Sequence, residues 1–179
     1  MRGVDGLHSE RARRRDRQSD GTTVMIGNAC GPCLREAIRK FESGHARLLT
    51  ICEELEVMAD GLPALPNNGS HLRLARRMGM VLREVHAREE AEILPVLVAA
   101  LGANIGRDSV GTLVEEHRAD EAAAEELAEV IIEWAAGERN HDAATLGYML
   151  RGLFDNIRRH SDRERDQLIA PAQRRLAPD

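Results

Sequence analysis

Residues 86–95 read HAREEAEILP, and their spacing indicates a helix that turns polar side chains toward a hydrophobic core. His86 and Glu90 stand four residues apart, so an α-helix would stack them on one face. The same face continues with Leu82 before them and Ile93 after them, at steps of three or four residues. The stretch therefore predicts an amphipathic helix whose buried stripe contains an imidazole and a carboxylate.

The same arrangement returns in two later segments of the chain. His117 is followed by Glu121, and His160 by Glu164, again on apolar stripes. His45 lies on the stripe of an earlier segment, so each of four predicted helices carries one such histidine. One His–Glu pair is usually a surface ion pair, but seven buried titratable groups are very costly to desolvate without a compensating charge. We therefore expect a bound cation. The remaining histidines are expected to be ordinary surface residues: His8, His71 and His141.

Gly, Pro and Asn divide the chain into four helical segments, with no sustained alternation typical of strands. Ser70 is the expected N-cap of the second segment, and Pro95 is expected to kink it. The segments are predicted at about 32–59, 70–101, 108–136 and 142–171. Four helices with short connections predict an all-α, up-down-up-down four-helix bundle.

Length and composition limit the other possibilities. The 179 residues suit one domain, predicted at 29–179, after a charged tail at 1–28 that we expect to be disordered. Met25 is an alternative first residue of the protein, in which case most of the tail would not be translated. The net charge of −5 gives no reason to expect nucleic acid as a partner, and no apolar run approaches the roughly 20 residues that span a membrane. The first residues lack an apolar segment typical of a secretory signal, so we expect a cytoplasmic protein.

The seven candidate ligands indicate which metal is bound. Four imidazoles and three carboxylates are too many for one tetrahedral zinc ion, but suffice for two ions. Nitrogen and oxygen ligands without thiolate suit iron or manganese, and facing helices of a bundle are where di-iron carboxylate sites are built. Two Fe²⁺ ions against three carboxylates leave one positive charge, which a bridging hydroxide would cancel. Two iron ions are therefore expected, with manganese less favoured.

These motifs together resemble the hemerythrin-like family, which has an HHE cation-binding domain. The resemblance covers about Phe41 to Pro171. It rests on one feature in each predicted helix. The first and third helices carry His45 and His117. The second carries His86 and Glu90 followed by Leu94-Pro95, and the fourth carries His160 and Glu164 followed by Leu168 and Pro171. It implies a non-haem di-iron centre (Fe²⁺/Fe³⁺ with a bridging oxo or hydroxo group) in a four-helix bundle. Glu90 and Glu164 would be the bridging carboxylates, and the four histidines would be terminal ligands.

The sequence departs from the oxygen-carrying members of that family at two positions. Their third helix supplies HxxxH, whereas the second position here is Glu121. Their fourth helix has HxxxxD, whereas position 165 here is Arg and the acid is Glu164. A carboxylate in place of an imidazole stabilises ferric iron, so reversible oxygen carriage is disfavoured. Glu121 is either a metal ligand or a partner of a histidine.

Three functions follow as alternatives. The first is binding or sensing of oxygen, nitric oxide or iron, with a small diatomic molecule or peroxide as the partner. The second is an enzyme that breaks down hydrogen peroxide or oxidises ferrous iron. The third keeps the fold without metal and uses the histidines and glutamates as a buried hydrogen-bonded network.

The cysteines form a separate motif. Cys30 and Cys33 flank Gly31-Pro32, and Pro32 is well placed to start the first helix. The spacing matches thioredoxin-like redox motifs, although no βαβ pattern surrounds it. Two unremarkable thiols, a redox pair and an auxiliary metal site remain open for them. Cys52 is expected in the core.

Overall fold

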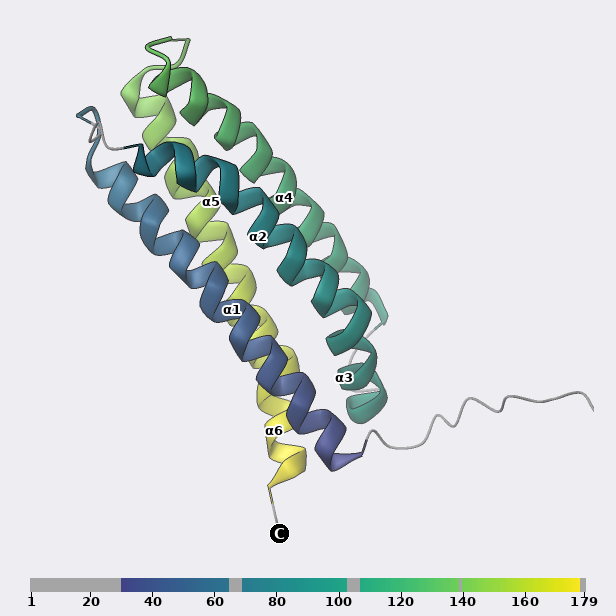
Figure 1. Cartoon of the computed structure of the whole chain (residues 1–179). Helices are drawn as coiled ribbons and strands as arrows, with labels where there is room; N and C mark the ends of the chain where they lie inside the picture. The colour runs from purple at the N-terminus through teal and green to yellow at the C-terminus, as the bar shows by residue number, and fades with distance from the viewer. Residues whose placement is uncertain (1–29, 65–68, 103–106, 139, 178–179) are drawn as a thin grey trace, which may run out of the picture.

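The computed structural model describes residues 30–64, 69–102, 107–138 and 140–177. Their regular structure is entirely helical, and Figure 1 shows the helices packed side by side along their length. The elements are α1 (Gly31–Asp60), α2 (Ser70–Arg88), η1 (Glu89–Ile93), α3 (Leu94–Leu101), α4 (Arg107–Ala135), α5 (Ala143–Glu164), η3 (Arg165–Ile169) and α6 (Ala170–Leu176). The predicted all-helical bundle is confirmed. The predicted tail, Met25 and His8 lie outside the described residues.

The helix ends follow local chemistry. Pro32 lies in the first turn of α1, where its missing N–H costs nothing. Asp142 caps α5 by accepting a hydrogen bond from the Thr145 N–H at 2.7 Å. The prediction for Ser70 is wrong, because Gly69 occupies the N-cap position with a φ of 69° and Ser70 is the first helical residue. A left-handed φ of this kind favours glycine.

Two π-helical turns interrupt the second and fourth long helices. In η1 the Leu94 N–H donates to the Glu89 carbonyl, and in η3 the Ala170 N–H donates to the Arg165 carbonyl, five residues back. Each turn is followed by a proline, Pro95 or Pro171. A proline lacks the N–H that an α-helix needs, and its ring clashes with the carbonyl four residues before it. The expected distortion at Pro95 therefore takes the form of a π turn.

The helices pack mainly in two pairs, α1 with α5 and α2 with α4, which further contacts join into one bundle. Two clusters of buried apolar side chains lie along it. In α1, Phe41 belongs to one cluster and Leu48 to the other, and His45 lies between them. In α5 and its continuation, Ile157 and Leu168 belong to different clusters in the same way. The core is thus divided by a layer of polar groups. None of the described helices combines the length and apolar character needed to cross a bilayer.

Candidate metal centre

Each of the four long helices places one histidine in the polar layer. All four of these histidines are at least 97% buried. The rings of His86 and His117 stack in parallel, with centroids 4.1 Å apart, and the His160 ring lies 4.9 Å from that of His117. Together with two buried glutamates they form what we call the His/Glu cluster, which consists of His45, His86, Glu89, His117, His160 and Glu164.

Glu164 is the carboxylate that the histidines share. Its Oε2 lies 3.0 Å from the Nε2 of His45 and 3.2 Å from the Nε2 of His160. Its Oε1 lies 3.7 Å from the Nε2 of His117. Glu164 therefore contacts imidazoles from three helices: α1, α4 and its own helix α5.

Glu89 contacts two of the histidines from η1, the continuation of α2. Its Oε1 lies 2.9 Å from the Nε2 of His45, and its Oε2 lies 3.4 Å from the Nε2 of His117. Two groups of potential ligand atoms result, each with atoms within 4.8 Å of one another, and both contain Glu164. The groups are His45, Glu89 and Glu164, and His117, His160 and Glu164.

The converging atoms suit metal ligation better than hydrogen bonding. Seven of these atoms are buried and make no hydrogen bond within the described part of the chain. They are the Nε2 atoms of His45, His117 and His160 and the four carboxylate oxygens of Glu89 and Glu164. Buried polar atoms are rarely left in that state unless another group satisfies them. Imidazole nitrogens and carboxylate oxygens around a shared point are the donors that iron and manganese accept. The cluster therefore fits a bound cation.

Two further carboxylates hold imidazole rings from outside the cluster. The Nδ1 of His117 donates to Glu90, and the Nδ1 of His86 donates to Glu121, both at 2.9 Å. When such a ring is neutral, the proton on Nδ1 leaves the Nε2 lone pair for a metal. Both carboxylates are partly exposed, with 38% and 26% of the side-chain surface accessible. Their geometry is that of partners that fix the orientation of a ligand.

Comparison with known families agrees with this geometry. The family model described as Hemerythrin HHE cation binding domain matches residues 36–172, which is most of the chain.

The chain belongs to the hemerythrin HHE cation-binding family.

The match includes all six members of the His/Glu cluster, and the expected family resemblance is confirmed. Comparison with curated proteins and with solved structures gives no significant match.

Burial and mutual contacts set opposite charge states within this HHE domain. Burial, together with the nearby rings of His117 and His160, lowers the pKa of His86 to about 3, so this ring is neutral near pH 7. Burial would also lower the pKa of His117, but the carboxylates that touch its ring outweigh burial and raise it to about 10. Burial would raise the pKa of Glu164, yet its three imidazole contacts hold it well below the usual range. Glu164 is therefore a carboxylate, ready to bind a cation.

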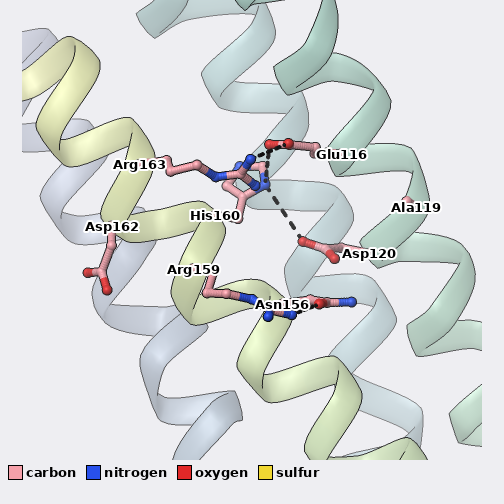
Figure 2. Close-up of a pocket in the computed structure, with 8 residues that line it drawn as sticks. All are labelled: Glu116, Ala119, Asp120, Asn156, Arg159, His160, Asp162 and Arg163. Atoms are coloured by element: carbon pink, nitrogen blue, oxygen red, sulfur yellow. Dashed lines mark hydrogen bonds and ion pairs between the residues drawn. The ribbon is translucent and has the colours of Figure 1, made fainter.

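A cavity of about 610 Å³ approaches the cluster of the HHE domain between α4 and α5. Figure 2 shows His160 at this cavity beside Glu116 and Asp120, whose oxygens lie 3.5 and 3.7 Å from its Nδ1. Arg163 pairs with Glu116 at 2.7 Å. Burial raises the pKa of Asp120 to about 6. The cavity gives a small polar molecule a path toward His160.

The structure separates the seven predicted ligands of the HHE domain into residues inside the buried cluster and residues outside it. It buries the four histidines and Glu164 together, but His86 belongs to neither ligand group, and Glu90 and Glu121 also lie outside both. Glu89, which the sequence reading had not chosen as a ligand, takes the buried position beside His45. Glu89 lies three residues after His86 and Glu90 lies four residues after it. Steps of three and four both stay on one helix face, so residue spacing does not distinguish the two glutamates.

None of the three cysteines is a member of the His/Glu cluster, and Cys30 and Cys33 precede the residues that match the family model. Cys30 and Cys33 form a disulfide at the start of α1, with Cα atoms 5.2 Å apart. Cys52 is a free, fully buried thiol in the core, as expected.

Proposed function

We propose that the His/Glu cluster holds two iron ions, with Glu89 and Glu164 as the shared carboxylates. The observation that carries this proposal is the pair of ligand groups that have Glu164 in common. One group offers two imidazoles and the other offers one, and Glu89 reaches toward both His45 and His117. Shared carboxylates between two ions are the arrangement of di-iron sites in helix bundles. Manganese, which accepts similar donors, is the alternative metal.

The proposed activity is binding or sensing of a small diatomic molecule, oxygen or nitric oxide, or of iron itself. When bound, ferrous iron supplies the electrons and the open coordination position that such ligands require. The chain's own contribution is to exclude water from the buried side and to fix the rings. Glu121 accepts a hydrogen bond from the Nδ1–H of His86 and raises the electron density of that ring, which favours ferric iron. Easily reversed oxygen carriage is therefore not the proposed activity.

Breakdown of peroxide or oxidation of ferrous iron is a second candidate, and the cavity beside His160 supports it. The cavity offers a route for a substrate that is small and polar, and its wall carries both acidic and basic side chains. Arg159 and Arg163 are basic groups there, and Glu116 and Asp120 are acidic. Steady oxygen evolution from peroxide by iron-loaded protein would favour this candidate.

The metal content of the purified protein tests whether the cluster binds iron at all. Protein grown with ample iron and purified without oxygen should contain about two irons per chain, and its optical spectrum should change when oxygen is admitted. Fewer than about one iron per chain would overturn both the sensing and the enzymatic proposals. The buried hydrogen-bonded network without metal would then be the better account.

A matched pair of variants tests which glutamate is the ligand. Glu89→Gln and Glu90→Gln make the same chemical change at neighbouring residues of the same helix. We expect Glu89→Gln to lose at least one iron per chain, because Glu89 is buried between two imidazoles. Glu90→Gln should keep two irons with affinity lowered about 10–100-fold, as is typical for partners of ligating histidines. The reverse order would assign the bridging position to Glu90.

A further inference from the structure

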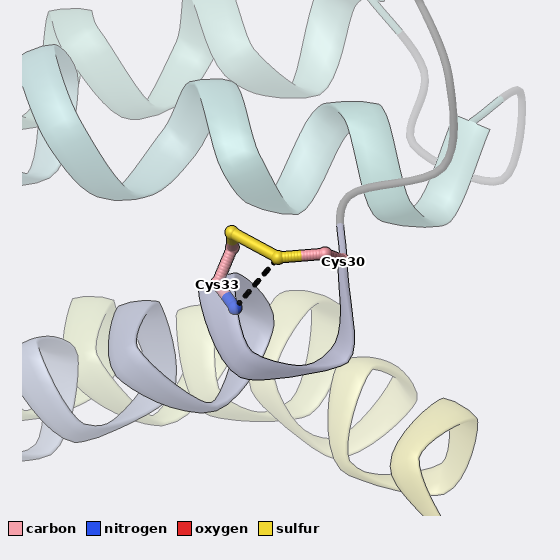
Figure 3. Close-up of a disulfide and its surroundings, with 2 residues drawn as sticks. All are labelled: Cys30 and Cys33. Atoms are coloured by element: carbon pink, nitrogen blue, oxygen red, sulfur yellow. Dashed lines mark hydrogen bonds between the residues drawn. A yellow bond between two sulfur atoms is a disulfide. The ribbon is translucent and has the colours of Figure 1, made fainter.

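The pair of cysteines at the start of α1 is a chemical site that the metal centre does not use. Figure 3 shows the disulfide between Cys30 and Cys33 at the first turn of the helix. Both residues are exposed, so their sulfurs can meet a partner molecule. The loop that the disulfide closes is very short. A short loop restrains the unfolded chain much less than a long one, so the bond contributes little as a structural staple.

The surroundings of Cys30 favour a negative charge on its sulfur. Cys30 is the N-cap of a 30-residue helix, and its Sγ accepts a hydrogen bond from the Cys33 N–H at 3.3 Å. The positive end of the helix dipole stabilises an anion at this position. The first turn of α1 contains no acidic residue that would offset this effect.

Arg35 adds a positive charge next to the same turn. A Cβ placed on Gly31 would lie 3.7 and 3.8 Å from the two terminal nitrogens of the Arg35 guanidinium, so this group covers the residue after Cys30. Within the described residues, no carboxylate pairs with Arg35. Its charge is therefore available to a thiolate at the helix start.

We propose that Cys30 and Cys33 are a redox-active dithiol–disulfide site, with Cys30 as the nucleophile and Cys33 as the resolving thiol. In the reduced protein the Cys30 thiolate attacks one sulfur of a substrate disulfide. The other substrate sulfur leaves as a thiolate and takes up a proton. Deprotonated Cys33 then attacks Cys30 Sγ, the bond to the substrate breaks, and the substrate leaves as a dithiol. Two electrons pass from the cysteine pair to the substrate, and two molecules of a thiol such as glutathione then reduce the pair and leave joined as their own disulfide.

Equilibration of the full-length protein with glutathione redox buffers tests the proposal. Thiols are trapped by acid and alkylation, and the state of each cysteine is read by peptide mass. We expect the pair to pass from disulfide to dithiol in one two-electron transition within the buffer range. In Cys33→Ser, Cys30 should accumulate as a mixed disulfide with glutathione, at least tenfold faster than Cys33 does in Cys30→Ser. Buried Cys52 is the internal control and should remain unmodified.

A matched pair of arginine variants isolates the effect of charge. In a Cys33→Ser background, Arg35→Gln should slow the alkylation of Cys30 by iodoacetamide two- to fivefold at pH 7. Arg39→Gln removes the same charge from the same helix, but Arg39 pairs with Glu36, so the rate should hardly change. A pair that stays oxidised in reduced glutathione alone overturns the proposal. An alkylation rate for Cys30 equal to that of glutathione itself does so too. Iron content should be the same in all these variants, so this result stands apart from that of the metal proposal.

Discussion

Glu121 and Glu90 influence the proposed metal centre without touching the shared carboxylates. Each accepts a hydrogen bond from the Nδ1–H of one imidazole and so fixes which ring nitrogen faces the cluster. We predict that Glu121→Gln lowers iron affinity about 10–100-fold while two irons per chain still bind at saturation. Competition with a chelator measures the affinity. Glu125→Gln, one turn further along α4, is the control for the charge change. Unchanged affinity in Glu121→Gln would show that its contact with His86 has no part in metal binding.

Cys52 gives the stability of the metal-free protein a defined dependence on pH. Burial raises the pKa of this thiol from 9.0 to about 12. Between those values the unfolded chain loses the proton and the folded chain keeps it, so stability present below pH 9 is lost as pH rises. The loss approaches about 1.4 kcal/mol per pH unit. Urea unfolding at pH 8, 9 and 10 measures it. Cys52→Ala should show a shallower decline, and equal declines would contradict the prediction.

Sequence reasoning reached most of the candidate site but not all of it. One histidine on each apolar stripe was enough to gather four imidazoles, because steps of three and four residues fix the helix face. The same reasoning could not separate Glu89 from Glu90, since both positions lie near that face. Glu89 is buried and Glu90 is exposed, and the helical register changes in η1, which begins at Glu89. That register depends on backbone hydrogen bonds, which residue spacing does not report.

At the scale of helices, the two π turns lie next to the glutamates of the proposed metal centre. Glu89 opens η1, and Glu164 immediately precedes η3, so each shared carboxylate lies beside a register change. The sequence predicted the four long helices from apolar periodicity and the positions of Gly, Pro and Asn, and a distortion at Pro95 from the proline itself. It missed the cap at Gly69, because the choice between Gly69 and Ser70 depends on a left-handed backbone angle.

We predict that Pro95→Ala weakens metal binding without destabilising the fold. Pro95 is exposed, so its removal sacrifices no packing, and alanine can donate to the carbonyl four residues back. The π turn can then close to α-helix, which rotates Glu89 and Ile93 relative to each other. We expect a thermal midpoint at or above that of the wild type and an iron affinity about tenfold lower. Pro32→Ala, at the start of α1, is the control. Wild-type iron affinity in Pro95→Ala would mean that packing alone maintains η1.

For the whole molecule, the polar layer joins all four long helices between two apolar clusters. A cation that binds this layer in the folded state alone must stabilise the bundle. With free metal at 100 times its dissociation constant, we predict a gain of about 2.7 kcal/mol, or a thermal midpoint about 5–10 °C higher. Thermal unfolding with and without a chelator measures this. Glu164→Gln should show a much smaller metal-dependent shift, and an equal shift would place the stabilising metal elsewhere.

The two ligand groups differ in how they depend on chain connectivity. His117, His160 and Glu164 all come from the second half of the chain, from the hairpin of α4 and α5. The group with His45 and Glu89 lies in the first half but borrows Glu164 from the second. The two positions are therefore inequivalent in the helices that they require. The first needs only α4 and α5 to be packed together, whereas the second also needs α1 and η1 in place.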